Sequence, residues 1–310
     1  MKMAMRHKLN QSTRWMFNFK AWQPTESEWC NAIMHLNEDE RRRIGKFRYR
    51  DDAKASLAGR LMIRLWSKNF LSYCSCPDLK LSISRTEKGR PKLTLSPVQI
   101  ESTRNINFDF NVAHAGDLTV FAAEVDSIRN ISVGVDVMPL FDRRRDQNME
   151  NFLRLMKRQF TLKEWEQIQK SSVSCDDNNK DTMKRFYRFW CLKESFVKAE
   201  GSGLAWDLQR LSFNCPTVEL CSFKIVKDTI LNLDGCPVDT WEFQEHLLHG
   251  NHCAAVAVNI NDVSEDKTTP IFESVTLHDL LSQDSKVNDF NKQERNEWDI
   301  FLSMLIEKPF

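Results

Sequence analysis

The chain has 310 residues, 41% of them hydrophobic and 28% charged, and its 44 basic and 43 acidic side chains leave a formal net charge of +1. This length and composition predict a folded, soluble protein with one large domain or two modest ones. The balanced charge excludes a global field that would attract nucleic acid or a membrane surface, so any electrostatic partner must be recognised locally.

The sequence shows no segment for secretion or membrane insertion. Its apolar runs fall short of the roughly 20 residues that span a bilayer, and its start lacks the apolar core of a secretory signal. The residues before Glu26 include basic and hydroxyl side chains but no acid, which weakly resembles a mitochondrial presequence. Nine scattered cysteines form no repeated spacing. We therefore expect a cytoplasmic protein with reduced thiols.

The first part of the chain predicts one long helix followed by strands. Residues 50–66 repeat apolar side chains at helical spacing, which predicts about four turns of helix. The stretch LKLSISRTEKGRPKL then predicts a strand and a turn around Gly89. Two further strands are expected in INFDFNVAHAGDLTVFAAEV, interrupted at HAGD, and another in ISVGVDVMPL.

The second part repeats this order of elements. Residues 143–170 have helical spacing, with Thr161 and Glu164 placed as a capping box. A polar loop, 171–181, precedes a helix that contains FYRFWCLKESFVKAE. Strands are expected in LSFNCP, CSFKIVKD, WEFQEHLL and HCAAVAVNI.

These elements predict an α+β fold of two halves, each with a small, mostly antiparallel sheet and a long helix. We place the halves at residues 1–125 and 126–260. Residues 261–310 have the composition of a polar linker with an appended helix, and no chemistry is assigned to them.

Asp136 lies in a predicted strand. Strict alternation puts Val133, Val135 and Val137 on one face, and Asp136 on the other. A carboxylate beside so many valines is costly to bury without a cation or a donor, so Asp136 is either partnered or a solvated edge residue.

Glu194 lies at the border of the apolar stripe of the second long helix. Its ordinary interpretation is an i, i+4 salt bridge to Lys198. If Glu194 faces Asp136 instead, the two carboxylates could hold Mg²⁺, which prefers carboxylate and phosphate oxygens.

Two basic segments could bind anions. RTEKGRPKL places cations around Gly89, where backbone and side chains could enclose a phosphate, although a basic hairpin turn is the ordinary interpretation. RRRIGKFRYR, residues 41–50, interleaves arginines with aromatic residues, which suits a nucleotide or nucleic acid, although such a run is usually a solvated face. A third cluster, HLLHGNHC, offers His246, His249, His252 and Cys253 but lacks the paired spacing of zinc sites.

Several motifs in order resemble the 4′-phosphopantetheinyl transferase superfamily, above all its eukaryotic cytosolic members. They are RIGKFRYRDDAKASLAGRLMIR, RTEKGRPKL, FNVAHAGD, GVDVM, FTLKEW and FYRFWCLKESFVKAEGSGL, and the likeness runs from about Trp15 to Asn259. The family implies a pseudo-dimer of two similar α+β halves, with coenzyme A and Mg²⁺ in the cleft between them. It also implies a monomer.

The resemblance also implies an activity and its residues. The phosphopantetheine arm of coenzyme A would be transferred to a serine of apo acyl or peptidyl carrier domains, such as those of fatty acid synthase and of aminoadipate-semialdehyde dehydrogenase type enzymes, with release of 3′,5′-ADP. Asp136 and Glu194 would ligate the metal, Glu194 would be the general base, and Lys198 would be the other catalytic residue. The residues implied in coenzyme A binding are these two acids together with Arg50, Arg85, Thr86, Glu87, Lys88, Gly89, Arg90, Asn111, Val112, Ala113, His114, Lys193, Ser195, Phe196, Val197 and Lys198.

The chain departs from the family pattern at the metal. Met138 stands where many bacterial relatives have a second acid, and Ala115 stands where the closer eukaryotic pattern has glutamine. Water, a backbone carbonyl or Asp117 could complete the shell. Ala113 replaces a serine, and Arg50 lies one position from the basic residue expected at the 3′-phosphate of coenzyme A.

Two alternatives remain. One is a binding module for carrier domains or RNA that uses the basic aromatic segment without chemistry, and the other is an unrelated Mg²⁺ nucleotidyl transferase that releases pyrophosphate. Because carrier domains are generally acidic near their serine, the basic stretches RRRIGKF, DRRRD and LMKRQF are candidate docking faces.

Overall fold

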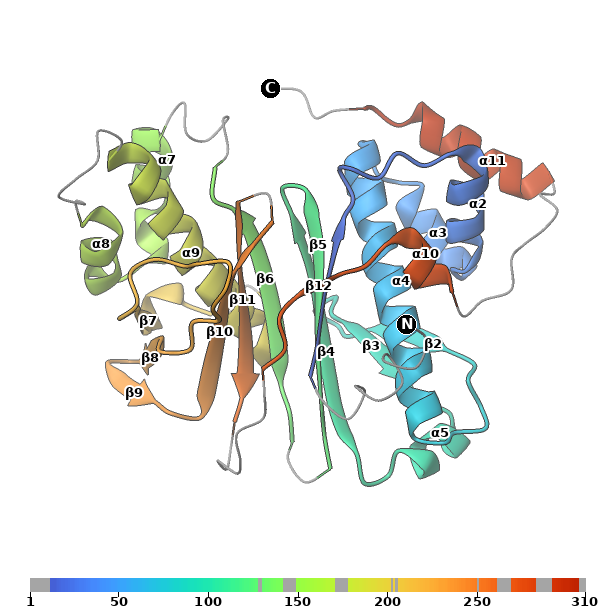
Figure 1. The fold of residues 1–310 in the computed structure, drawn as a ribbon, viewed down its shortest axis with the longest axis horizontal. Helices are drawn as coiled ribbons and strands as arrows, with labels where there is room; N and C mark the ends of the chain where they lie inside the picture. The colour runs from blue at the N-terminus through green and yellow to red at the C-terminus, as the bar shows by residue number, and fades with distance from the viewer. Residues whose placement is uncertain are drawn as a thin grey trace.

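The structure is a computed structural model, and it describes residues 12–127, 130–141, 149–170, 178–201, 203, 206–249, 251–260, 269–282 and 292–306. Two halves lie side by side, each with a long helix against antiparallel strands (Figure 1). The predicted α+β fold of two halves is confirmed.

The first half is built on a sheet with strand order β12-β1-β5-β4. The long helix α4 packs on this sheet through an apolar face that includes Leu57, Leu61 and Trp66. The other helices of this half, and a hairpin, lie around α4 (Figure 1). Its elements are β1 (Thr13–Asn18), α2 (Glu26–Met34), α3 (Glu38–Ile44), α4 (Arg50–Tyr73), β2 (Ser82–Arg85), β3 (Pro91–Thr94), α5 (Pro97–Ser102), β4 (Asn107–Ala115) and β5 (Leu118–Asp126).

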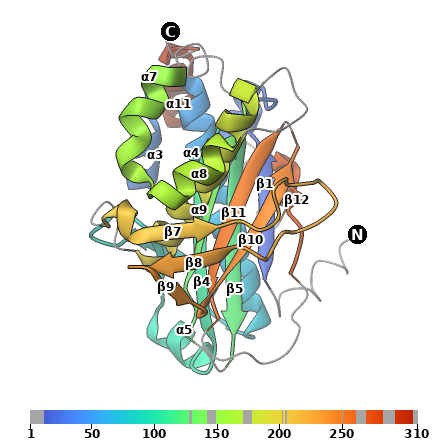
Figure 2. The same cartoon turned by 90° about the vertical axis from the view of Figure 1, so that its left-hand side faces the viewer.

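The second half repeats the plan with the sheet β10-β11-β6 and the long helix α9. A separate sheet, β7-β8-β9, lies on its outer side (Figure 2). The elements are β6 (Val133–Pro139), α7 (Met149–Met156), η1 (Lys157–Gln159), α8 (Leu162–Gln169), α9 (Asn178–Glu200), η3 (Leu208–Arg210), β7 (Leu211–Asn214), β8 (Ile230–Leu233), β9 (Cys236–Val238), β10 (Trp241–Leu248) and β11 (His252–Asn259).

Side chains join the two halves at the edges of β4 and β6. Asp109 Oδ2 accepts from the backbone N–H of Val133 at 2.7 Å, and Asn111 Oδ1 accepts from that of Val135 at 3.2 Å. The valine face of β6 packs in an apolar cluster with residues of β4 and β5, as the alternation predicted. The two sheets therefore meet through an apolar layer and side-chain hydrogen bonds.

The C-terminal segment returns to the first half. β12 (Glu273–Ser274) pairs in parallel with β1, and α10 (Leu277–Leu281) packs near α4. In α11 (Lys292–Ser303), the Phe301 ring stacks on Trp29 with ring centroids 4.0 Å apart. This segment is thus part of the first half's core (Figure 1).

Most of the predicted elements are correct, but the polar loop expected at 171–181 ends earlier, because α9 begins at Asn178. The helix expected at residues 50–66 is longer, and Thr161 forms the expected capping box with Glu164. The strand expected in CSFKIVKD is wrong, because this stretch makes only isolated bridges, and the strands of the outer sheet are β7, β8 and β9. In the described part of the chain, no helix is both long and apolar enough to cross a bilayer.

A buried histidine predicts how stability depends on pH. Burial, followed by the charges of Arg14 and Lys227, lowers the pKa of His246 from 6.5 to about 3. The unfolded chain therefore takes up a proton at a higher pH than the folded protein does. The free energy of unfolding should fall by about 1.4 kcal/mol per pH unit as the pH drops from 6.5 toward 3.

Urea unfolding of the wild type and of His246→Phe at several pH values measures this effect. The phenylalanine keeps a ring against Phe272, which contacts His246 edge-to-face at 4.9 Å between centroids. The variant should lose this part of the pH dependence, whereas His278→Asn on the exposed face of α10 should keep it. Equal slopes in His246→Phe and the wild type would contradict the assignment.

Candidate active site

Asp136 and Glu194 come together because α9 lies very close to β6. A Cβ atom on Gly134 would collide with the backbone oxygen of Ser195 and the backbone nitrogen of Ala199. Only glycine permits this approach. Asp136, two residues further along the strand, points to the same face. It thereby meets the turn of α9 that carries Glu194 and Lys198.

Asp136 is only 7% exposed and is incompletely satisfied. Its Oδ1 accepts a hydrogen bond from Lys198 Nζ at 2.6 Å, whereas its buried Oδ2 has no partner among the described residues. Burial raises the pKa of Asp136, against the lowering effects of Lys198, of the Val137 backbone N–H and of the Cys191 thiol. Because an unpartnered buried carboxylate oxygen is costly, this atom is suited to a cation.

Glu194 is half-buried beside this pair. Burial raises its pKa first, the charge of Asp136 raises it further, and Lys198 lowers it. Burial disfavours the charge of Lys198, but Asp136 and Glu194 outweigh burial and raise its pKa. Among the described residues Lys198 thus forms its salt bridge with Asp136 on β6, and not the i, i+4 pair with Glu194 that is the ordinary interpretation of the sequence.

These three charges leave one excess negative charge, which a divalent cation with oxygen ligands would compensate. The residues present therefore fit the metal through Asp136 and Glu194. Among the described residues, no three His, Cys, Asp or Glu side chains are grouped so that they could hold a metal ion. Beyond Asp136 and Glu194, the remaining metal ligands would therefore be oxygens of other kinds. Met138 is largely buried in the core of the second half, and its side chain has no oxygen to offer.

The β2–β3 hairpin lies beside the C-terminal end of α9. A Cβ on Gly201 would lie 3.9 Å from Arg90 Nη1, and one on Gly203 would lie 3.9 Å from Lys88 Cδ. The predicted turn is confirmed, and Arg85 donates to Gly89 O at 2.5 Å. The residues at its tip, Arg85, Thr86, Glu87 and Lys88, are exposed. Cations on this loop are therefore exposed near the C-terminal end of α9.

Near the hairpin, Arg60 joins Arg43 and Arg85 in a cluster that the sequence analysis did not bring together. Arg60 is 8% exposed, and its Nε lies 3.7 Å from Glu40. Burial, the charge of Arg85 and that of Arg43 lower the pKa of Arg60 to about 10, against the raising effect of Glu40. The three arginines around one glutamate leave an excess of positive charge that suits a phosphate group. Arg60 was overlooked because it lies on the predicted α4 helix among apolar residues.

Lys193 corrects one expectation. We expected it to contact coenzyme A, but its ammonium is fully buried and donates to Leu208 O and Leu211 O at 2.6 Å each. It also pairs with Glu164 at 2.9 Å. Lys193 points into the second half because it lies on the opposite side of α9 from Asp136, and there it joins α8 to α9.

Other expected contact residues are also occupied within the protein. Ser195 is buried and donates a hydrogen bond to Leu192 O. Phe196 and Val197 both belong to the apolar core of the second half. Asn111 bonds to β6 at the seam, and Ala113 is in the apolar cluster there. Side-chain contacts of these residues with coenzyme A are therefore not supported. Asn111 and Ala113 lie on β4, where Val112 is half-buried and His114 is exposed.

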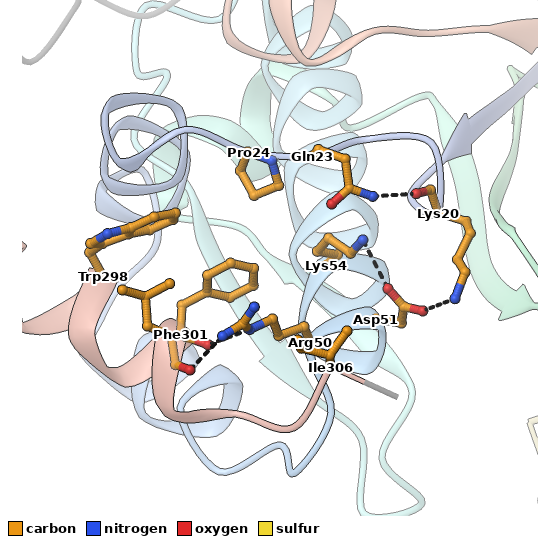
Figure 3. A pocket seen from close by; sticks show the side chains of 10 residues that line it. Lys20, Gln23, Pro24, Arg50, Asp51, Lys54, Trp298, Phe301 and Ile306 are labelled. Carbon is orange, nitrogen blue, oxygen red and sulfur yellow. Dashed lines mark hydrogen bonds and ion pairs between the residues drawn. The ribbon is translucent and has the colours of Figure 1, made fainter. Parts of the chain in front are cut away.

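Arg50 lies elsewhere. It lines a pocket of about 260 Å³ between the N-terminal end of α4 and α11, and none of the residues lining this pocket comes from β6 or α9 (Figure 3). Its guanidinium donates to Phe301 O at 3.2 Å and to Leu302 O at 2.5 Å. The structure thus does not bring Arg50 together with the two carboxylates.

The histidine cluster does not assemble into a zinc site. His252 accepts from the backbone N–H of Asp117 at 3.3 Å, and Cys253 donates to Met138 O at 3.6 Å. The buried His246 contacts Phe272, and His249 is exposed. Arg143 to Arg145, in the candidate docking stretch DRRRD, lie outside the described residues.

Comparisons with known proteins define the class of the chain. A family model described as "4′-phosphopantetheinyl transferase, N-terminal" matches residues 20–126, and one described as "4′-phosphopantetheinyl transferase superfamily" matches residues 132–257. The chain belongs to the 4′-phosphopantetheinyl transferase superfamily, and the resemblance seen in its motifs is confirmed.

Curated relatives match most of the chain. The L-aminoadipate-semialdehyde dehydrogenase-phosphopantetheinyl transferase of Rattus norvegicus is 34% identical over 94% of this chain and 91% of its own length. The protein of the same name from Xenopus laevis is 36% identical over 94% and 96%. A phosphopantetheinyl transferase of Thraustochytrium sp. is 29% identical over 79% and 77%.

The close approach at Gly134 yields a prediction for stability. Gly134→Ala should force α9 away from β6 and lower the free energy of unfolding by about 1–3 kcal/mol or more, as overpacking does. Gly45→Ala is the matched control, because its Cβ would meet Ile300 at an ordinary 3.5 Å. Chemical denaturation measures both, and an equally stable Gly134→Ala would contradict the contact.

The carboxylate pair predicts metal binding. Asp136→Asn and Glu194→Gln should each weaken binding of Mn²⁺, used as a spectroscopic substitute for Mg²⁺, since each removes a charged oxygen ligand. Electron paramagnetic resonance of free Mn²⁺ gives the affinities. Asp239→Asn, at an exposed position, should bind Mn²⁺ as the wild type does. Unchanged affinity in both site variants would refute the site.

Proposed function

We propose that the protein transfers the 4′-phosphopantetheine arm of coenzyme A to a serine of an apo carrier domain and releases 3′,5′-ADP, with Mg²⁺ held by Asp136 and Glu194. The observation that carries this proposal is the unpartnered buried Oδ2 of Asp136 beside Glu194 and Lys198. Membership of the superfamily supports the reaction class.

In the reaction, the serine oxygen forms a bond to the β-phosphorus of coenzyme A as the bond from that phosphorus to the 3′,5′-ADP oxygen breaks. Glu194 accepts the serine proton as the general base. Bound Mg²⁺ would supply positive charge to the phosphate oxygens. Lys198 holds Asp136 in place and adds a second cation.

The surrounding cations support a substrate with several phosphates. The exposed hairpin cations and the arginine cluster around Glu40 lie on the first half, while the carboxylates belong to the second. A cosubstrate with a pyrophosphate and a further phosphate would have charge partners on both halves. The apolar seam between the halves within one chain supports a monomer as the working unit.

The printed names of the relatives guide the choice of acceptor. Carrier domains of aminoadipate-semialdehyde dehydrogenase type enzymes come first, because the rat and frog relatives are named for that enzyme. Carrier domains of fatty acid synthase are the second class to test, and the cytoplasm is the proposed location.

Incubation with coenzyme A, Mg²⁺ and apo carrier domains tests the proposal. Intact mass should show one added phosphopantetheine, and chromatography should show 3′,5′-ADP. Glu194→Gln should lower the rate by about 100-fold or more because the general base is lost. Glu166→Gln, at an exposed position on α8, is the matched control.

The products separate the alternatives. Release of pyrophosphate would indicate a nucleotidyl transferase. Binding of carrier domains without any mass gain, unchanged by Glu194→Gln, would indicate a binding module and refute the transferase.

A further inference from the structure

Arg90 holds the C-terminal end of α9. Its Nη1 donates to the backbone carbonyls of Lys198 at 2.7 Å and Ala199 at 3.2 Å. The last carbonyls of a helix have no partner within the helix, and a cation there also interacts favourably with the helix dipole. Arg90 thus fixes the turn from which Lys198 reaches Asp136.

The same guanidinium holds the strand that carries Asp136. Arg90 Nη2 donates to Val133 O at 2.7 Å, three residues before Asp136. It also donates to Phe110 O at 3.1 Å on β4. One planar group therefore contacts α9, β6 and β4, and it sets the position of the helix relative to the strand.

Asp109 supplies the matching charge. Its Oδ2 accepts from Arg90 at 2.6 Å and from the backbone N–H of Val133 at 2.7 Å. Its pKa is raised by burial, against the lowering effects of Arg90 and Val133. A partly buried ion pair with several further hydrogen bonds has little freedom to move, so it can hold both neighbours in place.

These contacts leave Arg90 poorly placed to act as a ligand of coenzyme A. Its two terminal nitrogens already donate to five oxygens of the protein. A lysine at this position could reach one or two of these acceptors but not all of them, because it lacks the planar fork.

We propose that Arg90 and Asp109 are positioning residues, which set the distance between Asp136 on β6 and Glu194 on α9 from the other half of the molecule. This inference rests on the proposed function and deepens it, because the first half then controls the geometry of the carboxylates in the second. A displacement of about 1 Å at such a site can cost on the order of a hundredfold in rate.

Three measurements on Arg90→Lys and Asp109→Asn test the proposal. Turnover should fall by about 10- to 100-fold in kcat, with the KM for coenzyme A changed by less than about threefold. The affinity for Mn²⁺ should fall by about tenfold, as when outer residues orient metal ligands. In the metal-free protein, amide hydrogen exchange should become faster over residues 195–201.

A double variant and two control variants of an exposed ion pair distinguish a positioning role from a general loss of stability. Arg90→Lys combined with Asp109→Asn should cost little more than either alone, since both break one unit. Arg210→Lys and Asp234→Asn break an exposed ion pair of 2.6 Å and should leave kcat and Mn²⁺ affinity unchanged. Thermal unfolding verifies that each variant is folded under the conditions of the assay.

The outcomes are distinct. A raised KM for coenzyme A in Arg90→Lys, with kcat and Mn²⁺ affinity unchanged, overturns the proposal and makes Arg90 a substrate contact. If the wild type transfers nothing but binds Mn²⁺, the proposed function fails, and weaker Mn²⁺ binding in both variants still supports positioning. Unchanged Mn²⁺ affinity and unchanged amide hydrogen exchange in both variants overturn the positioning proposal. A wild type that neither transfers phosphopantetheine nor binds Mn²⁺ also overturns it.

Discussion

The close approach of α9 to β6 at Gly134 is the constraint on which the candidate site depends. Any side chain at this position would displace the helix backbone, and with it Glu194 and Lys198. The contact allows a helix and a strand to present charged groups to each other at hydrogen-bond distance. The geometry of the site therefore follows from backbone packing before any ligand is bound.

The charges of the site explain why it can be both buried and functional. Two carboxylates near each other would strongly destabilise the folded protein without a cation, and Lys198 offsets part of this cost. It does so incompletely, since Asp136 keeps one oxygen without a partner among the described residues. This imbalance favours binding of a cation, and Ala115 and Met138 leave the remaining ligand positions to water, backbone or substrate.

The sequence could predict what depends on local pattern. Alternation placed the valines and Asp136 on opposite faces of β6, and the capping box located the start of α8. It could not predict Lys193, whose burial depends on how α8 and β7 lie across α9, nor the return of the C-terminal segment to α4. The family resemblance carried Lys193 and Asn111 over as ligand contacts because a motif records which residues occur together, not which way each side chain points.

The interface between the two halves also positions the candidate site. β4 and β6 share no backbone ladder, and Asp109 and Asn111 bridge their edges with side-chain oxygens. Such bridges are directional, so they fix the height of β6 relative to β4 as well as its distance. Arg90 extends the same network to the end of α9. Two halves joined by an apolar layer alone could slide, and these hydrogen bonds oppose a sliding that would move β6 and the end of α9 relative to β4.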